Sequence, residues 1–168
     1  MKREYLIGHS YDIHRFDDKG DFILLAHVKI PTENLSVIAH SDGDCLLHSL
    51  SEAILSALGL NDIGYYFPDN SEDTSNMDSR EILTFALSEM RERNYEINNV
   101  VIHIALEKPK LSKYKLEIKK SLVELLNCEE EYISVLAGTE ENIGAIGQGL
   151  AVKVTSTVML RKETNNGN

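Results

Sequence analysis

The chain has 168 residues, of which 42% are hydrophobic and 26% are charged, a composition typical of one globular domain with a core of its own. Its formal net charge is −10 at pH 7, and so acidic a surface repels phosphate backbones, which argues against nucleic acid as a partner. No apolar run is long enough to span a bilayer, and the start of the chain turns polar after Ile7, so we expect no membrane association and no signal peptide. We therefore expect a cytoplasmic protein, with a plastid-type organelle as the alternative if a leader has been removed.

The pattern of apolar residues predicts a series of strands and helices. In chain order, the predicted elements are strands at 4–8 and 22–30, helices at 44–58 and 79–93, a strand at 97–106, a helix at 113–127, and strands at 132–137 and 150–161. This order is typical of an α+β fold, in which a single mixed sheet of about four strands has its helices packed on one face. The other face is left to water or to another subunit. We expect residues 1–163 to form this single domain and residues 164–168 to be a disordered tail.

The stretches HSYDIH and AHSDGDCLLHSL hold four of the six histidines of the chain. Asp12 and His14 are two positions apart in an extended segment, so their side chains point to the same side, and we expect Ile13 to point into the protein. His48 lies on the first turns of the helix that follows. One aspartate and two histidines with a fourth position open are typical of a catalytic zinc site. The alternative is an Asp-x-His pair without function and a core histidine whose hydrogen bonds are satisfied.

The turn SDGD, just before this helix, is rich in residues that favour a helix N-terminus. We expect Asp42 and Asp44 to cap the helix and to orient a metal-binding histidine through hydrogen bonds. His40 and Ser41 come just before the N-terminus, where backbone N–H groups and the helix dipole favour anions. A metal beside an anion site suggests a ligand that carries phosphate.

Three further stretches are candidate binding loops. They are DIGYYFPDN at 62–70, EKPKL at 107–111 and GTEENIGAIGQG at 138–149. A carboxylate of the third loop could hold magnesium while that ion bridges two phosphates. Taken singly, a loop of this kind is more often plain surface.

Together, the motifs GHSYDIH, AHSDGDCLLHSL, DIGYYFPD, DSREIL, KPKL and TEENIG resemble those of the 2-C-methyl-D-erythritol 2,4-cyclodiphosphate synthase family, from Ile7 to about Gly149. The resemblance implies a homotrimer whose sheets face a central axis and whose active sites lie between neighbouring subunits. It implies a phosphorus–oxygen lyase of the non-mevalonate pathway, which makes isoprenoid and terpenoid precursors. The implied small-molecule substrate is 4-diphosphocytidyl-2-C-methyl-D-erythritol 2-phosphate, whose 2-phosphate attacks the β-phosphate to give 2-C-methyl-D-erythritol 2,4-cyclodiphosphate and CMP.

The resemblance also assigns roles to residues at matching positions. The metal ligands that it implies are Asp12, His14 and His48, for zinc or manganese, and Glu141, for magnesium or manganese on the diphosphate. The catalytic residues that it implies, which steady the transferring phosphate, are His40 and Thr139. The substrate-binding residues that it implies are Ser41, Asp62, Ile63, Gly64, Phe67, Pro68, Asp69, Leu106, Glu107, Lys108, Pro109, Lys110, Leu111, Ser112, Gly138 and Glu140.

The chain departs from the family pattern in the loop 138–149. The threonine run usual before the metal-binding glutamate is replaced by Gly-Thr-Glu-Glu, so an alignment anchored on the Thr-Glu pair would choose Glu140 in place of Glu141. An arginine that points to the trimer axis in relatives is Gln148 here, and an aromatic residue is Ala145. These departures motivate an alternative function, a degenerate trimeric zinc-binding homologue without turnover. A third option, phosphate ester hydrolysis, would give a linear product in place of a ring.

Overall fold

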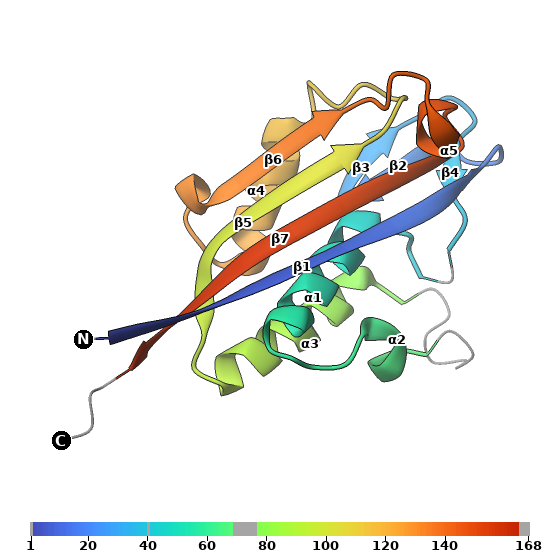
Figure 1. Cartoon of the computed structure of the whole chain (residues 1–168). Coiled ribbons are helices and arrows are strands. Elements are labelled where there is room, and N and C mark those ends of the chain that lie inside the picture. Colours follow the sequence, from blue (N-terminus) through green and yellow to red (C-terminus); the bar gives the residue numbers. More distant parts are fainter. Residues whose placement is uncertain (1, 40, 69–76, 165–168) are drawn as a thin grey trace.

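The computed structural model describes residues 2–39, 41–68 and 77–164, which form a five-stranded sheet with helices packed on it (Figure 1). The sheet consists of β1 (Lys2–Asp17), β4 (Ser36–Val37), β5 (Glu96–Ala105), β6 (Ile133–Gly138) and β7 (Ala151–Thr164). Their order across the sheet is β4-β1-β7-β5-β6. Because β5 and β6 run parallel and the other neighbours run antiparallel, the sheet is mixed. The predicted α+β class is confirmed, with five strands in the main sheet where about four were expected.

Three longer helices lie on one side of this sheet, as predicted. They are α1 (Cys45–Ala57), α3 (Ser79–Glu92) and α4 (Lys115–Leu126). In Figure 1, α1 and α4 lie behind the sheet, and α3 packs against α1. The described residues also form three single turns, which are α2 (Ile63–Tyr66), the 3₁₀ turn Glu130–Tyr132 and α5 (Gly144–Gly147). None of the helices in the described part of the chain is long and apolar enough to cross a membrane.

The core lies between α1 and the central strands. Leu46, Leu50 and Ile54 recur at helical spacing on α1 and are fully buried, as is Val154 on β7. Gly8 lets β1 approach the helix closely, since a Cβ at this position would lie 1.8 Å from the carbonyl oxygen of Ala53. The backbones of β1 and α1 therefore lie close together at Gly8, and both elements carry residues of the predicted metal site.

Two of the predicted strands differ from the structure. The first strand does not end at residue 8 but continues to Asp17, because β1 pairs with β7 along almost its whole length. The segment 22–30 is a hairpin of β2 (Phe22–Leu25) and β3 (Val28–Pro31) rather than one strand. Its turn residues, Ala26 and His27, have φ values of 52° and 62° in the left-handed region, and neither is a glycine.

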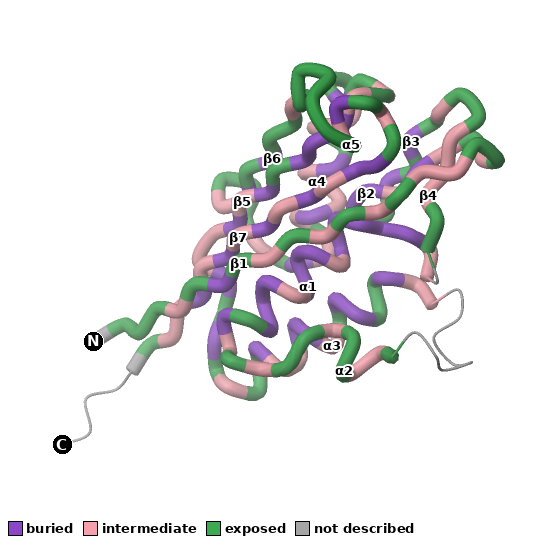
Figure 2. Tube along the Cα trace, turned by 45° about the vertical axis from the view of Figure 1, so that its right-hand side comes forward, coloured by how far each residue is buried: buried purple, intermediate pink, exposed green. Residues whose placement is uncertain are grey.

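The sheet face opposite the helices carries exposed apolar side chains of β1. Tyr5, Ile7, Tyr11 and Ile13 are 48%, 67%, 60% and 48% exposed. Figure 2 shows these exposed positions recurring along β1. The expectation that Ile13 points into the protein was wrong, because its neighbours in the metal site face the helices and alternation turns Ile13 outward. Apart from Thr164, which is the last residue of β7, the predicted tail lies outside the described residues.

Candidate functional site

The turn that leads into α1 fixes where this helix begins. Asp44 is its N-cap residue, fully buried, and its side chain accepts the N–H of Leu47 at 3.0 Å. The same carboxylate accepts the N–H groups of Ala26 at 3.0 Å and His27 at 2.6 Å. One buried carboxylate therefore joins the hairpin turn to the helix start and sets the position of His48, one turn further on.

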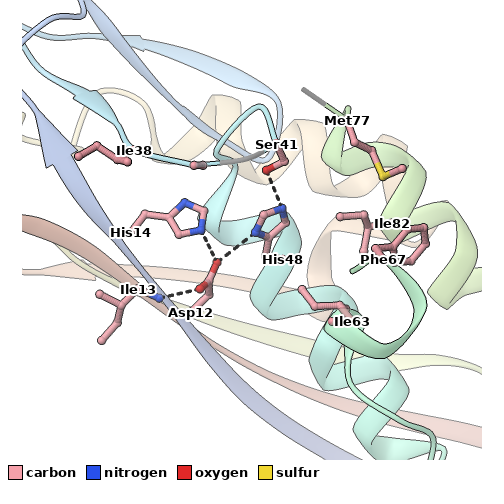
Figure 3. Close-up of a pocket in the computed structure, with 12 residues that line it drawn as sticks. Asp12, Ile13, His14, Ile38, Ser41, His48, Ile63, Phe67, Met77 and Ile82 are labelled. Atoms are coloured by element: carbon pink, nitrogen blue, oxygen red, sulfur yellow. Dashed lines mark hydrogen bonds and ion pairs between the residues drawn. The ribbon is translucent and has the colours of Figure 1, made fainter. Parts of the chain in front are cut away.

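Asp12, His14 and His48 converge in the structure, as the sequence predicted (Figure 3). Oδ2 of Asp12 lies 2.9 Å from Nε2 of His14 and 3.2 Å from Nδ1 of His48, and one ligand atom from each residue lies within 4.8 Å of the others. The two histidine side chains are 12% exposed and the aspartate is 25% exposed, so the cluster is mostly shielded from water yet reachable. Two residues of β1 and one residue of α1 thus form the group.

Each histidine of the cluster uses its other ring nitrogen to contact the protein. Nδ1 of His14 lies 3.2 Å from the carbonyl oxygen of Gly43, which can only accept. Nε2 of His48 lies 3.2 Å from Oγ of Ser41 and 2.9 Å from Oγ of Ser79. Such contacts fix the orientation of a metal-binding imidazole and its tautomer.

The charges within the cluster stabilise each other. Burial alone would raise the pKa of Asp12, but the hydrogen bonds and the charge of protonated His14 and His48 outweigh it, so the pKa of Asp12 is lowered. Burial alone would lower the pKa of His14, but the hydrogen bond to Asp12 and the charge of that carboxylate raise it. The site therefore favours positive charge beside an ionised carboxylate. A metal ion bound to the two neutral imidazoles would take the place of these protons beside the same carboxylate.

The donor set fits a divalent ion of the zinc type. A tetrahedral ion with bonds of roughly 2.0–2.1 Å holds its ligand atoms about 3.3 Å apart, close to the two separations measured from Asp12. Imidazole nitrogen and carboxylate oxygen suit zinc and manganese. With three protein ligands, one coordination position is left for an oxygen of a substrate.

A cavity of about 370 Å³ opens beside the cluster. Its lining residues are Asp12, Ile13, His14, Ile38, Ala39, Ser41, His48, Ile63, Gly64, Phe67, Met77 and Ile82. Glu52 on α1 anchors one wall, because its carboxylate accepts the N–H of Ile63 at 2.9 Å. The ring of Phe67 packs edge-on against Phe85 of α3, with 5.5 Å between the ring centres. The wall formed by α2 is therefore fixed to both α1 and α3.

Comparison with known proteins agrees with this geometry. The model of the YgbB family matches residues 5–161. The chain belongs to the YgbB family. A relative from Acinetobacter baumannii, named 2-C-methyl-D-erythritol 2,4-cyclodiphosphate synthase, is 41% identical over 161 residues, which are 95% of this chain and 99% of the relative.

Solved structures of YgbB-type proteins share the fold. The chain named IspF from Plasmodium falciparum, solved as a CDP complex, has a TM-score of 0.83 and 35% identity, over 95% of this chain and 97% of that one. The bifunctional IspDF of Campylobacter jejuni has a TM-score of 0.89 and 37% identity, over 96% of this chain and 43% of that one. The YgbB fold therefore occurs both alone and within a longer protein.

The structure divides the predicted substrate-binding residues of this YgbB chain between separate places. Ser41, Ile63, Gly64 and Phe67 line the metal-site cavity, whereas Asp62 is exposed and caps α2 by accepting the N–H of Tyr65 at 2.9 Å. Of the residues predicted for the phosphate and the methylerythritol, two lie outside the described residues, and they are His40 and Asp69. Pro68 is exposed and does not line this cavity.

A second cavity, of about 310 Å³, lies at the ends of β5 and β6. It is lined by Leu106, Glu107, Lys110, Leu111, Ser112, Lys115, Ala137, Gly138 and Thr139, all of them predicted site residues except Lys115 and Ala137. Glu107 ties the two loops together, because its carboxylate accepts the N–H of Glu140 at 2.9 Å. Lys108 and Pro109 line a different hollow, on the side of Tyr114. The second cavity shares no lining residue with the metal-site cavity.

Glu141 lies outside both of these cavities within the single chain. It is exposed, with a φ of 51°, and its Oε1 accepts the hydroxyl of Thr139 at 3.2 Å. Sequence reasoning missed Ile38, Met77 and Ser79, which line the metal-site cavity or contact His48. Ser79 lies within the motif DSREIL, one of those that carry the resemblance, but the motif assigned no role to this serine.

Proposed function

We propose that the chain converts 4-diphosphocytidyl-2-C-methyl-D-erythritol 2-phosphate to 2-C-methyl-D-erythritol 2,4-cyclodiphosphate with release of CMP, in isoprenoid precursor biosynthesis. The main support is the convergence of Asp12, His14 and His48 in a chain of the YgbB family, with each histidine oriented for metal binding. The name of the Acinetobacter baumannii relative and the CDP complex of the Plasmodium falciparum protein support the same reaction and a cytidine nucleotide ligand.

The reaction joins two phosphates that are both anions, so charge must be compensated. Asp12, His14 and His48 would hold a zinc or manganese ion, which would supply positive charge beside a phosphate oxygen and so lower this repulsion. The nucleophile is already ionised, so no strong base is needed, and the protein contributes position and electrostatics. Because one phosphate displaces CMP from another, the proposed class is a phosphorus–oxygen lyase.

The remaining residues of the proposed site hold and orient the substrate. Ile63, Gly64 and Phe67, beside the cluster, fit the methylerythritol unit. We assign Asp62, Pro68 and Asp69 to the same unit from the sequence. The cavity around Leu106–Ser112 fits the cytosine, and its lysine side chains suit an anionic nucleotide. We assign magnesium on the diphosphate to Glu141, and the steadying of the transferring phosphate to His40 and Thr139.

The proposed enzyme is a homotrimer with an active site between subunits. In a single chain, β7 and β5 separate β1 from β6, and three strand steps of about 4.8 Å place these strands on the order of 14 Å apart. The metal-site cavity and the proposed cytosine cavity share no lining residue and lie on strands separated by this distance, so a single chain does not join them into one pocket. The exposed apolar side chains of β1 offer a surface on which a neighbour could pack and bring its own cavity to the metal. We place the reaction in the cytoplasm, since its substrate is multiply charged and does not cross membranes unaided.

The activity can be tested directly with purified protein, the diphosphocytidyl substrate, zinc and magnesium. We expect release of CMP, together with the phosphorus NMR spectrum of a cyclic diphosphate. Removal of metal with a chelator should stop the reaction, and zinc should restore it. No CMP at full zinc occupancy would favour the degenerate homologue, and a linear product would favour a hydrolase.

A further inference from the structure

Ser79, the first residue of α3, contacts the back of a proposed metal ligand. It is fully buried, and its Oγ lies 2.9 Å from Nε2 of His48. Asp42 accepts two hydrogen bonds from this serine. One carboxylate oxygen accepts the hydroxyl, and the other accepts the backbone N–H at 3.1 Å. Asp42 itself is held at both ends, because its N–H donates to the carbonyl of Met77 at 3.0 Å and its side chain accepts the N–H of Asp44 at 3.1 Å.

The direction of these hydrogen bonds follows from the chemistry of the groups. A carboxylate can only accept, so the Ser79 hydroxyl must donate its one proton to Asp42. The serine oxygen can then act only as an acceptor, so Nε2 of His48 is the donor in this contact of 2.9 Å, and Oγ of Ser41 lies further from the same nitrogen, at 3.2 Å. With its proton on Nε2, the ring of His48 has its lone pair on Nδ1, the nitrogen that faces Asp12.

We propose that Ser79 and Asp42 are positioning residues for the metal: together they hold the proton of His48 on Nε2 and aim Nδ1 at the ion. This inference rests on the proposed metal site. A hydrogen-bonded partner behind an imidazole ligand also fixes the plane of the ring, so loss of the partner weakens metal binding while the ligand itself remains. His14 uses the opposite nitrogen for the same purpose, donating from Nδ1 to Gly43.

Asp42 could instead belong to a second ion site, because the ligand atoms of His27, Asp42 and Asp78 also lie within 4.8 Å of one another. Asp78, however, already accepts Nε of Arg80 at 3.0 and 2.9 Å and the N–H of the same residue at 2.9 Å. The guanidinium supplies the positive charge that an ion would bring. The oxygens of Asp42 are likewise engaged with backbone and hydroxyl donors, so we assign this residue to orientation rather than to a second metal.

The test compares Ser79→Ala with Ser51→Ala. Ser51 is an equally buried helix serine whose hydroxyl donates to the carbonyl of Leu47 at 2.7 Å, on α1. Zinc affinity is measured by competition with a chelator. We expect Ser79→Ala to bind zinc on the order of 10–100-fold more weakly than wild type, and Ser51→Ala to bind it as wild type does.

A proton NMR spectrum of the zinc-loaded protein adds a readout that depends on the ring. In wild type, we expect a slowly exchanging imidazole N–H signal from Nε2 of His48, and a second one from Nδ1 of His14. Ser79→Ala should lose the first signal and keep the second, which serves as an internal control.

The outcomes separate this inference from the metal site on which it rests. Equal zinc affinity of the two serine variants, with the His48 signal retained in both, overturns the positioning role alone. Failure of wild type to bind zinc overturns the metal site. If Ser79→Ala does not fold, the wild-type spectrum still decides, because zinc-loaded protein with no proton on Nε2 of His48 contradicts the proposal.

Discussion

Asp44→Ala should destabilise the fold well beyond the usual effect of removing a helix cap. The buried carboxylate accepts three backbone N–H groups, from Ala26, His27 and Leu47, and alanine can accept none. Two of these donors belong to turn residues in the left-handed region, a conformation that non-glycine residues adopt only when their surroundings hold them there. The substitution therefore affects the hairpin turn and the helix start together.

The magnitude follows from which donors lose access to water. Ala26 and Leu47 are buried, whereas His27 is exposed and its N–H can turn to solvent. A buried N–H left without a partner costs about 1–3 kcal/mol, so these two donors give about 2–6 kcal/mol. Removing the desolvated carboxylate offsets part of that cost, since burial raises the pKa of Asp44 and so disfavours its ionised form. We expect a loss of about 3 kcal/mol in the free energy of unfolding.

Urea denaturation of the metal-free protein measures this loss, and Asp62→Ala is the matched control. Asp62 caps α2 with a single bond to Tyr65 and is exposed, so its removal should cost about 1 kcal/mol or less. If Asp44→Ala lost no more stability than Asp62→Ala, the reasoning about the shared carboxylate would be refuted.

The remaining predictions concern the second metal, the packing of β1, assembly and pH. Glu141→Gln should weaken magnesium dependence more than zinc content, measured by activity titration and elemental analysis; the same effect from Glu140→Gln would shift the assignment by one residue. Gly8→Ala places a Cβ against the carbonyl of Ala53, and we expect a loss of about 2 kcal/mol or more in thermal unfolding, whereas wild-type stability would contradict the close approach. Ile7→Asp, at a position exposed in the single chain, should give a folded monomer by light scattering that releases no CMP, and a persisting trimer would argue against the β1 surface as the interface. Because burial raises the pKa of Asp44 in the folded state, the stability that this residue contributes is present at low pH and falls as the pH rises through that pKa. The free energy of unfolding of wild type should therefore fall relative to that of Asp44→Asn over this range. A difference between the two proteins that stays constant with pH would contradict the shift.

The fold class and most of the helices could be predicted from local patterns, because apolar residues at helical spacing form the buried face of α1 and α3. The length of β1 could not. Beyond Gly8, its helix-facing positions carry Ser10, Asp12 and His14, polar residues that interrupt the alternation by which a strand is recognised.

The hairpin at 22–30 was missed for a different reason. Its turn contains Ala26 and His27 in place of the glycines and asparagines that favour such turns. The turn is held by Asp44, 18 and 17 positions further along the chain. No local pattern carries a contact of that kind, so the segment resembles one continuous strand.

Only part of the candidate site could be predicted, because local patterns place single residues on elements but do not give the contacts between elements. Asp12, His14 and His48 are ligand types on elements with simple periodicity, and their convergence was confirmed. The contact of Ser79 with His48 depends on α3 folding back against α1, which is a tertiary feature. The division of the predicted binding residues into two cavities also depends on strand order, which the sequence pattern does not determine.

Diffraction data from crystals of zinc-loaded protein, collected on both sides of the zinc absorption edge, test the proposed metal centre most directly. We predict a single anomalous peak in each chain, bonded to a carboxylate oxygen of Asp12, Nε2 of His14 and Nδ1 of His48 at roughly 2.0–2.2 Å. A peak elsewhere in the chain, or three side chains that point to different neighbourhoods in the presence of zinc, would contradict the proposed site and the reaction that depends on it.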